Sequence, residues 1–387
     1  MSHPRLRAEH QPTIRPDGRI QIGSLPGLAS TLPDPGGWRR HLLRLLGGAL
    51  TEDQISQAVT SRHPDVSAAQ VAQLLLDLAR AGHVRDAVPA RRAIRLDPGS
   101  ARLHERGVEY WEMVDQDPGR SGADVQQILA RAVVTVVGIG GVGLTVAAAL
   151  AGAGIGCLIL ADHDRVEDSN LNRQLLYTHA DIGRYKVDAA RDRLLERHPD
   201  LDIDLYPEQV TFQAQFARLM RRCDLLILAA DEPDDLRLTA NRAALTTSCA
   251  WIDPGYHGPL ISTALYTPGV GDGPCWECLR HFDATAYGLP GTHGDVLAAA
   301  LPRPLGNPVI STSALLAGTY AAHAALTHLT GTRSTNPAGT IQRHSLIAPA
   351  DQTPRAITYP RNPDCPSCAP YHPKAAPTTS KKTLAAR

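Results

Sequence analysis

Residues 133–143, VVTVVGIGGVG, place a run of apolar residues directly before a cluster of four glycines. The run predicts a buried strand over Val133–Val137, and the small apolar residues after it predict a helix. Asp162 stands 19 residues after Gly143, at the end of the next apolar run. Glycines between a strand and a helix let the backbone approach phosphate, and an acidic residue at this spacing suits ribose hydroxyls. The stretch predicts a nucleotide site with glycines Gly138, Gly140, Gly141 and Gly143.

From Val133 onward, apolar runs alternate with helix-length segments. The predicted strands are Val133–Val137, Leu158–Ala161, Ile203–Tyr206, Leu225–Ala229 and Trp251–Asp253. Such alternation is typical of an α/β protein with a doubly wound, Rossmann-like, mostly parallel sheet. We expect this domain to span residues 131–370, with further strands and an Ala-rich helix after Gly258.

The first 95 residues predict a separate, small α+β domain of the winged-helix type. Capping-box patterns begin at Thr51 and Ser67, and three short helices with a flanking strand fit this length. The helices carry no dense Lys/Arg face, which favours peptide recognition over DNA binding. The segment from about Asp86 to Arg131 is charged and irregular, with Pro89, Pro98 and Pro118, so we expect residues 96–130 to form a linker with one short helix near Val108–Val114. Residues 371–387 predict a disordered tail.

Composition limits the classes of partner. The 387 residues are 43% hydrophobic, and 39 Lys and Arg balance 39 Asp and Glu. A net charge of zero gives no global attraction for a nucleic acid. The longest apolar stretch, Ala132–Leu150, is interrupted by glycines and is not typical of a membrane span, and the polar start lacks a signal-peptide core. We therefore expect a cytoplasmic protein with no membrane or nucleic-acid partner.

A second motif, DHDRVEDSNLNRQ at residues 162–174, is followed by Lys186 and, after a hydrophobic run, by Asp231. Two cations and an additional carboxylate exceed what a nicotinamide cofactor needs. They suit ATP attacked at its α-phosphate by a carboxylate, because Arg173 and Lys186 would neutralise the triphosphate and Asp231 would hold magnesium. A nicotinamide-dependent dehydrogenase is the alternative from the glycine loop alone, and it leaves Arg173 and Lys186 unexplained.

Together, the GIGGVG loop, the SNLNRQ block, Lys186 thirteen residues after Arg173 and the Ala-Ala-Asp ending at Asp231 resemble the ThiF/MoeB/ubiquitin-activating superfamily of adenylating enzymes. The resemblance covers about residues 131–368. It implies that Asp162 binds ribose and that Asp231 serves magnesium and the reaction. It also implies a nucleotide-binding set completed by Asp164, Asn170, Arg173, Gln174 and Lys186, of which Arg173, Lys186 and Asp231 are catalytic.

Two further features of that superfamily bear on this chain. Members tend to carry an arginine before the glycine loop that reaches a neighbouring subunit's ATP site, which implies a homodimer, with Arg106 as the candidate here. Glu232 stands where the family usually has Asn. Members that form a thioester or persulfide carry a cysteine after the first CxxC, and residues 279–308 contain none. We expect that segment, with His281 and Asp283, to be a mobile loop that covers substrate.

Four of the seven cysteines form two CxxC pairs. In a reducing compartment such pairs indicate a metal before disulfides, and four thiolates complete a closed, structural zinc site. The predicted zinc ligands are Cys275, Cys278, Cys365 and Cys368.

These features favour ATP-dependent adenylation of the C-terminal carboxylate of a peptide or small protein, which gives an acyl-AMP and pyrophosphate. The arrangement resembles the ThiF-like enzymes of peptide natural-product biosynthesis, of the microcin C adenylating type, in which an N-terminal domain clamps the peptide. Two alternatives stay open. One is activation of a ubiquitin-like sulfur-carrier protein, and the other is a non-catalytic peptide-binding scaffold for a partner enzyme.

Overall fold

The computed structural model describes residues 1–87, 98–268, 273–287, 307–332, 337–348 and 356–371. The chain divides into two compact units. Unit 1 contains Met1–Ala132, Leu150–Gly156 and Leu326–Ser334, and unit 2 contains Val133–Ala149, Cys157–Ala325 and Thr335–Arg387. The predicted tail lies, from residue 372 onward, outside the described residues. The predicted domain boundaries at residues 95 and 131 stay predictions.

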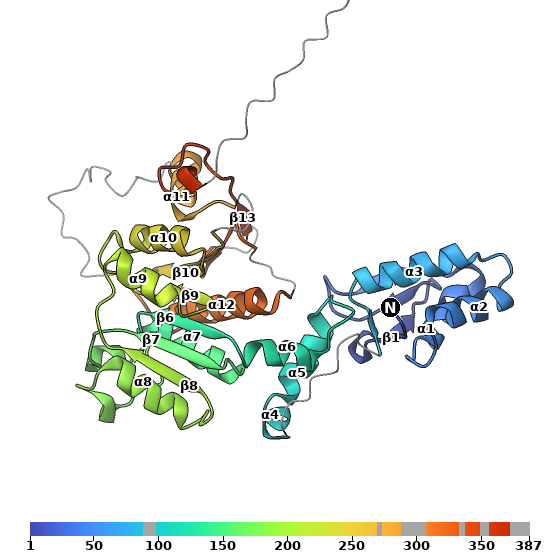
Figure 1. The fold of residues 1–387 in the computed structure, drawn as a ribbon, viewed down its shortest axis with the longest axis horizontal. Helices are drawn as coiled ribbons and strands as arrows, with labels where there is room; N and C mark the ends of the chain where they lie inside the picture. The colour runs from blue at the N-terminus through green and yellow to red at the C-terminus, as the bar shows by residue number, and fades with distance from the viewer. Residues whose placement is uncertain (88–97, 269–272, 288–306, 333–336, 349–355, 372–387) are drawn as a thin grey trace, which may run out of the picture. The chain divides into compact units, whose positions relative to one another are not determined.

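Unit 2 is built on an eight-stranded sheet in the order β13-β12-β11-β10-β9-β6-β7-β8 (Figure 1). Five neighbouring strands are parallel: β8 (Asp202–Tyr206), β7 (Cys157–Ala161), β6 (Val133–Val137), β9 (Leu225–Leu228) and β10 (Ala250–His257). The others are antiparallel: β11 (Leu260–Tyr266), β12 (Thr340–Ser345) and β13 (Ala356–Thr358). This arrangement confirms the predicted doubly wound, mostly parallel sheet. Strand β10 is longer than predicted because it continues into a hairpin with β11.

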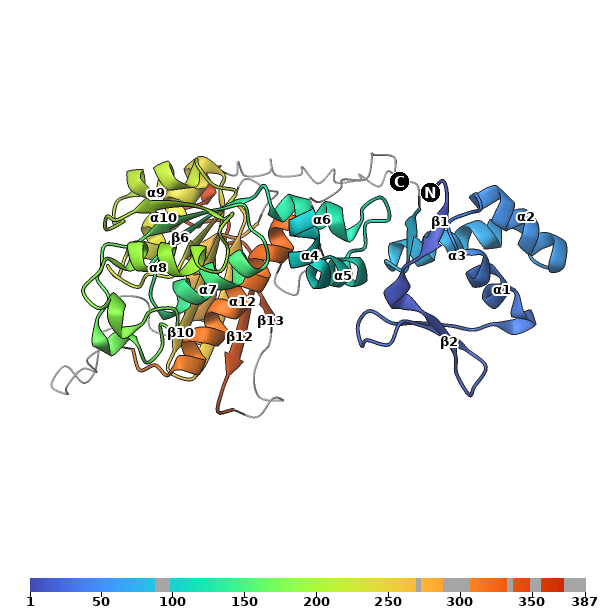
Figure 2. The ribbon, with the colours of Figure 1, turned by 90° about the horizontal axis from the view of Figure 1, so that it is seen from below.

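Helices cover both faces of this sheet. On one face, Phe216 of α9 (Gln213–Met220) and Ala240 of α10 (Leu236–Thr247) pack with Leu226 and Leu228 of β9. On the other face, Val142 of α7 (Gly141–Gly152) packs with Ala314 and Ala317 of α12 (Ser311–Thr330) and with Ile261 of β11. The view in Figure 2 shows α9 and α10 close together. Successive residues of a strand point to opposite faces of the sheet, and helices cover both faces here. Strands β6 and β9 are therefore buried on both sides, which explains why each is a continuous apolar run.

Unit 1 begins with short strands and three helices. Strands β1 (Pro4–Leu6) and β5 (Val84–Asp86) pair, and β2 (Pro12–Ile14), β3 (Ile20–Ile22) and β4 (Ser30–Leu32) form an antiparallel sheet. Helices α1 (Trp38–Leu45), α2 (Glu52–Arg62) and α3 (Ala68–Arg80) follow, and both predicted capping boxes, at Thr51 and Ser67, are formed. The three predicted helices are confirmed. Strands β1 to β4 were not predicted because three residues show no periodicity.

The short helix predicted near Val108–Val114 is confirmed, but the rest of residues 96–130, expected to be irregular, is also largely helical where the structure describes it. Residues 98–129 contain α4 (Pro98–Leu103), α5 (Glu105–Val114) and α6 (Gly122–Leu129). Pro98 is the first residue of α4, where the missing backbone N–H has no intrahelical partner to lose. Pro118 lies between α5 and α6, so neither proline interrupts a helix. Burial of Trp111 and a capping box between Ser121 and Asp124 hold these helices in unit 1.

Among the helices that the structure describes, none combines the length and the hydropathy needed to cross a bilayer.

Candidate functional site

A cavity of about 430 Å³ lies in unit 2 beyond the carboxyl ends of parallel strands. Its wall is formed by residues that end β6, β7 and β9 and by residues after β8. The chain runs from β6 outward to β7 and β8 and then returns to β9 on the other side of β6. Ligands of doubly wound sheets bind where the strand order reverses in this way. The cavity therefore occupies the position expected for a nucleotide.

The glycine loop is shaped for close approach of the backbone. Gly138 has φ +89°, and a Cβ there would stand 2.6 Å from the backbone nitrogen of Ala230. A Cβ at Gly143 would overlap the carbonyl oxygen of Gly138, so this glycine allows α7 to pack against the loop. Gly140 lines the cavity, and α7 begins at Gly141. The N-terminus of α7 thus presents backbone N–H groups and a positive dipole end beside the cavity.

Asp162 secures this loop. Its buried carboxylate accepts hydrogen bonds from the backbone N–H groups of Ile139 (2.6 Å) and Asp164 (2.8 Å), and the side chain lines the cavity. The structure therefore gives Asp162 a role in holding the loop, and its predicted contact with ribose stays a prediction.

Two cationic side chains line the cavity, as the motif predicts. The Nζ of Lys186, at the start of α8 (Lys186–Leu195), donates to Asp164 Oδ2 at 2.7 Å, and the Lys186 side chain is buried. Arg173 donates to the carbonyl oxygen of Ser169 and to Asn172 Oδ1, each at 3.0 Å. Lys186 and Arg173 thus stand on the same cavity wall as the glycine loop.

Asn170 and Gln174 lie behind the wall rather than in the cavity lining. Both are buried. Asn170 Oδ1 accepts from the backbone N–H of Glu167 at 3.2 Å and so closes the turn of the SNLNRQ block. The Gln174 Oε1 atom is buried and has no hydrogen-bond partner among the described residues. These two residues shape the segment that carries Arg173, and their predicted contact with a triphosphate stays a prediction.

Asp231 follows β9 and lies at the cavity edge, with its side chain 68% exposed. Arg237 of α10 donates to Asp231 at 3.0 Å and to Asp253 of β10 at 2.9 Å. The pKa of the Arg237 guanidinium is raised by Asp253 and by Asp231, and burial raises the pKa of the Asp253 carboxyl. Arg237 was not predicted, because only the fold brings the start of α10 beside the end of β9.

Tyr177 is a second residue that sequence reasoning missed. Its buried hydroxyl lies 3.2 Å from the carbonyl oxygen of Ile139 and 3.0 Å from that of Lys186. Burial raises the pKa of Tyr177 further above its usual range, so the phenol stays protonated and can donate. The hydroxyl thereby links the glycine loop to the start of α8. The segment 208–210 after β8, which also lines the cavity, could have been found from the strand-end rule.

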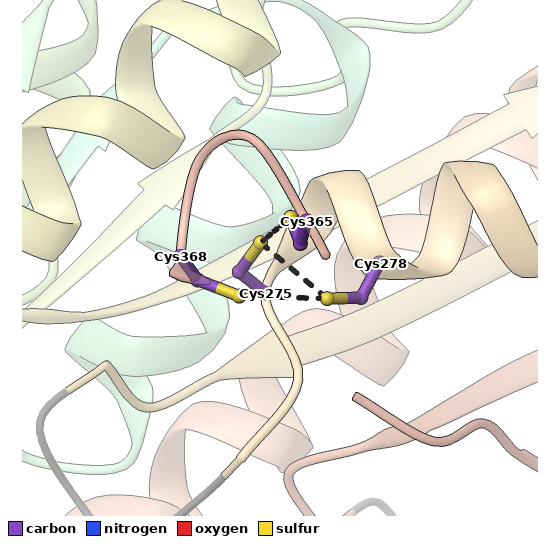
Figure 3. A group of neighbouring side chains, drawn as sticks. All are labelled: Cys275, Cys278, Cys365 and Cys368. Atoms are coloured by element: carbon purple, nitrogen blue, oxygen red, sulfur yellow. Dashed lines mark hydrogen bonds between the residues drawn. The ribbon is translucent and has the colours of Figure 1, made fainter. Parts of the chain in front are cut away.

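The four cysteines of the CxxC pairs come together (Figure 3). Cys275 and Cys278 belong to the start of α11 (Trp276–Tyr287), and Cys365 and Cys368 belong to the C-terminal segment. All four are buried, with Sγ–Sγ distances of 3.6 Å (Cys275–Cys365), 3.6 Å (Cys278–Cys368) and 3.9 Å (Cys275–Cys278). Zinc bound by four thiolates at about 2.3 Å holds the sulfurs about 3.8 Å apart. The cluster therefore fits a tetrahedral metal.

The expected loop at residues 279–308 is only partly described. His281 and Asp283 lie on α11, and the buried Asp283 accepts from Arg343 of β12 at 2.6 Å. Their placement in a loop was therefore wrong, because α11 continues past both residues. Residues 288–306 lie outside the described part. Arg106 is exposed on α5, where it pairs with Glu109 at 2.7 Å.

Solved structures share this fold over nearly the whole chain. The structure of Escherichia coli MccB with ATP superposes with a TM-score of 0.69 at 18% identity and covers 94% of this chain and 99% of that chain. A structure of PaaA superposes with a TM-score of 0.63 at 22% identity and covers 91% of this chain and 99% of that chain.

Curated relatives match part of the chain. The adenylyltransferase and sulfurtransferase MOCS3 of Culex quinquefasciatus is 35% identical over 165 residues, which is 41% of this chain and 35% of the relative. The match thus spans about a third of that longer protein. The sulfur carrier protein adenylyltransferase of Thermus thermophilus is 31% identical over 250 residues, which is 64% of this chain and 86% of the relative. The ThiF family model matches residues 116–367, more than half of the sequence, and the chain belongs to the ThiF family.

Proposed function

We propose that this protein uses ATP to adenylate the C-terminal carboxylate of a peptide. A carboxylate oxygen forms a bond to the α-phosphorus, the bond from that phosphorus to the β-phosphate oxygen breaks, and pyrophosphate leaves with the electron pair. The attacking carboxylate is already ionised at neutral pH, so the step requires no general base. This agrees with the cavity, whose described lining contains no Ser, Thr, Cys or Tyr.

The observation that carries this proposal is the joint placement of the glycine loop, Lys186 and Arg173 on one cavity. Backbone N–H groups at the start of α7 bind phosphate oxygens, and the two cations stabilise charge that develops on the leaving pyrophosphate. Asp164 positions the Lys186 ammonium group at the cavity, and on ATP binding this group would pair with a phosphate oxygen instead. The exposed carboxylate of Asp231 would hold magnesium, which would neutralise negative charge on the phosphates when bound.

Two findings favour a peptide over a carrier protein. The likeness to MccB and PaaA extends over 94% and 91% of this chain and therefore includes much of unit 1, whereas the Thermus relative aligns with 64%. One of the MccB structures is titled a complex of the microcin C7 biosynthetic enzyme with N-formylated MccA. We infer that residues 1–95 recognise the peptide. Activation of a sulfur-carrier protein is the second candidate, because two relatives, 31% and 33% identical, are named sulfur carrier protein adenylyltransferases.

We further propose that the cysteine cluster holds zinc in a structural role. The four buried thiols leave no open position for substrate, and the metal would tie the C-terminal segment to α11. Cys365→Ser should remove about one zinc per chain, measured by elemental analysis, and should lower the thermal unfolding midpoint. Cys157→Ser is the matched control because Cys157 lies outside the cluster. Equal zinc in both variants would contradict the assignment.

The experiment that tests the main proposal is ATP–pyrophosphate exchange with magnesium. The wild-type chain is assayed with each short peptide encoded beside its gene and, in parallel, with a ubiquitin-like carrier protein. Exchange that depends on a peptide with a free C-terminus, and is lost when that C-terminus is amidated, supports the proposal. Exchange with the carrier alone would move the assignment to the second candidate. Binding of peptide without any exchange would favour the scaffold alternative. Light scattering would test the homodimer that the family resemblance implies.

A further inference from the structure

Unit 1 contains a cavity of about 510 Å³ that is separate from the nucleotide site. It lies between β1 and β2 on one side and α1 on the other, and Ile20 of β3 contributes to its lining. The volume falls within the range of about 300 to 1,000 Å³ that small ligands occupy, so it can take a few side chains of a peptide but not a folded domain. Nothing in the nucleotide chemistry requires this cavity.

The charged side chains that line the cavity are all cationic. They are Arg5, Arg40 and Arg44, and no Asp or Glu belongs to the lining. Arg40 Nε donates to Asp34 at 2.9 Å. Arg5 and Arg44 are exposed and form no ion pair with any residue that the structure describes. Two guanidinium groups therefore face one cavity with their hydrogen-bonding capacity available.

The rest of the lining is substantially apolar. Leu6, Leu43 and Leu46 contribute to it, and Ile14 of β2 is 58% exposed. An exposed isoleucine beside a cavity offers contact area to another apolar side chain. A nucleic acid backbone would use the arginines but would leave this apolar surface uncovered, whereas a peptide can present carboxylates and apolar side chains together. The mixed lining therefore favours a peptide.

We propose that this cavity binds an acidic segment of the peptide substrate, with carboxylates at Arg5 and Arg44 and a neighbouring apolar side chain against Ile14 and Leu43. The inference rests on the proposed function, because it supplies the recognition of the same peptide that unit 2 activates. Guanidinium groups form paired, charge-assisted hydrogen bonds with carboxylates, so two of them select acidic side chains by geometry as well as by charge. Electrostatic attraction also speeds encounter at low salt.

A selection from a displayed library of random 12-residue peptides tests the proposal on the full chain. The wild type should enrich peptides that carry two or more Asp or Glu residues beside an apolar residue. The double variant Arg5→Gln/Arg44→Gln should lose this enrichment. The control Arg62→Gln/Arg80→Gln, which removes two exposed arginines outside the cavity lining, should keep it. Because all four side chains are exposed, every variant should fold, which circular dichroism verifies.

One recovered acidic peptide then serves as a fluorescent probe. Its affinity should fall at least tenfold in the Arg5→Gln/Arg44→Gln variant and should weaken with salt, while the control variant binds as the wild type does. Peptides recovered without acidic enrichment, or equal affinity in both double variants, would overturn the proposal. Wild-type binding of a labelled 20-base-pair DNA duplex that the cavity variant loses would overturn it in favour of a nucleic-acid site.

Pyrophosphate exchange separates this proposal from the function on which it rests. If neutral peptides bind and support exchange, the adenylation proposal stands and the acidic specificity fails. If acidic peptides bind at the cavity but no C-terminal carboxylate supports exchange, the specificity stands and the adenylation proposal fails.

Discussion

Two cavities in this protein differ in how their charged side chains are paired. In unit 2, two pairs of charged groups stand at the nucleotide cavity, Lys186 with Asp164 and Asp231 with Arg237. In unit 1, the fully buried Arg7 pairs with Glu112, whereas the cavity arginines Arg5 and Arg44 form no ion pair with any residue that the structure describes. Paired charges at a cavity pre-organise it for a ligand, whereas paired charges in the interior hold the fold.

This difference predicts that loss of an ion pair should reduce stability in unit 1 and reduce activity in unit 2. The largest effect should come from Glu112→Gln. Arg7 donates to the Glu112 carboxylate at 3.0 Å and to its carbonyl oxygen at 3.1 Å, which ties the N-terminal strand to α5. Removal of the anion leaves a buried guanidinium without its countercharge, which costs about 3 to 5 kcal/mol. Chemical denaturation, with hydrogen exchange of α5 as the local probe, measures the loss.

The same helix supplies the control for that prediction. Glu109→Gln breaks the Arg106–Glu109 ion pair of α5, in which both side chains are more than half exposed. Solvent screens such a pair, so this variant should unfold as the wild type does. Equal destabilisation by both substitutions would show that α5 is sensitive to any change, and the contrast between interior and surface pairs would fail.

The second prediction concerns the paired charges of unit 2. Asp231→Asn and, separately, Lys186→Met should each lower the rate of ATP–pyrophosphate exchange by about 100-fold or more, because Lys186 would supply positive charge to the triphosphate and Asp231 would supply the ligand for magnesium. Peptide binding to unit 1 should be unchanged. Asp168→Asn is the control, since Asp168 lies in the conspicuous motif but its side chain is 85% exposed and outside the cavity lining. A matching loss of peptide affinity would contradict the division of labour between the units.

The fold of unit 2 could be predicted from the sequence more completely than the fold of unit 1. Strands β6, β7 and β9 were predicted because a parallel strand buried on both faces is a continuous apolar run. Strands β2 to β4 have three residues each, which is too short for any pattern to appear. Helix α5 was predicted in part, near Val108–Val114, whereas α4 and α6 were mistaken for a linker because helices of six and eight residues are too short to show a clear periodicity.

The residues of the candidate sites could likewise be predicted only in part. Motif residues such as Lys186 and Arg173 were predicted to share one site, and both line the cavity. The four cysteines of the two CxxC motifs were predicted to form one site, and the structure brings their thiols together. Asn170 and Gln174 lie behind the wall, since a motif records which residues occur together but not which of them face the ligand.

The third prediction concerns the loss of stability of unit 1 at low pH. Burial, with a smaller effect of His10, lowers the pKa of His83 to about 4. The His83 Nδ1 atom lies 2.8 Å from His10 Nδ1, and its Nε2 atom lies 2.6 Å from the hydroxyl of Ser30. Because the unfolded chain takes up a proton near pH 6.5 and the folded one does not, stability is full above pH 6.5 and falls as the pH drops toward 4.

From pH 7 to pH 5 this linkage should cost about 2 kcal/mol, and hydrogen exchange in β4 and β5 should report it. His83→Gln should flatten the dependence, whereas His198→Gln, at a site in unit 2, should leave it in place. An identical slope in wild type and His83→Gln would assign the acid sensitivity to another group.

The smallest effect expected is that of Tyr177→Phe, and it examines how the paired charges of unit 2 are positioned. The Tyr177 hydroxyl lies within 3.2 Å of the Ile139 and Lys186 carbonyl oxygens, so it joins the phosphate loop to the helix that carries the cation. Loss of one buried hydrogen bond costs about 1 kcal/mol, so KM for ATP should rise by about three- to tenfold with little change in kcat. Tyr185→Phe, which alters a partly exposed ring at the same helix start, should leave KM unchanged. A fall in kcat at constant KM would instead mean that Tyr177 acts on the transition state. The hydrogen bonds of Tyr177 would then not be what positions the glycine loop and Lys186 for ATP binding.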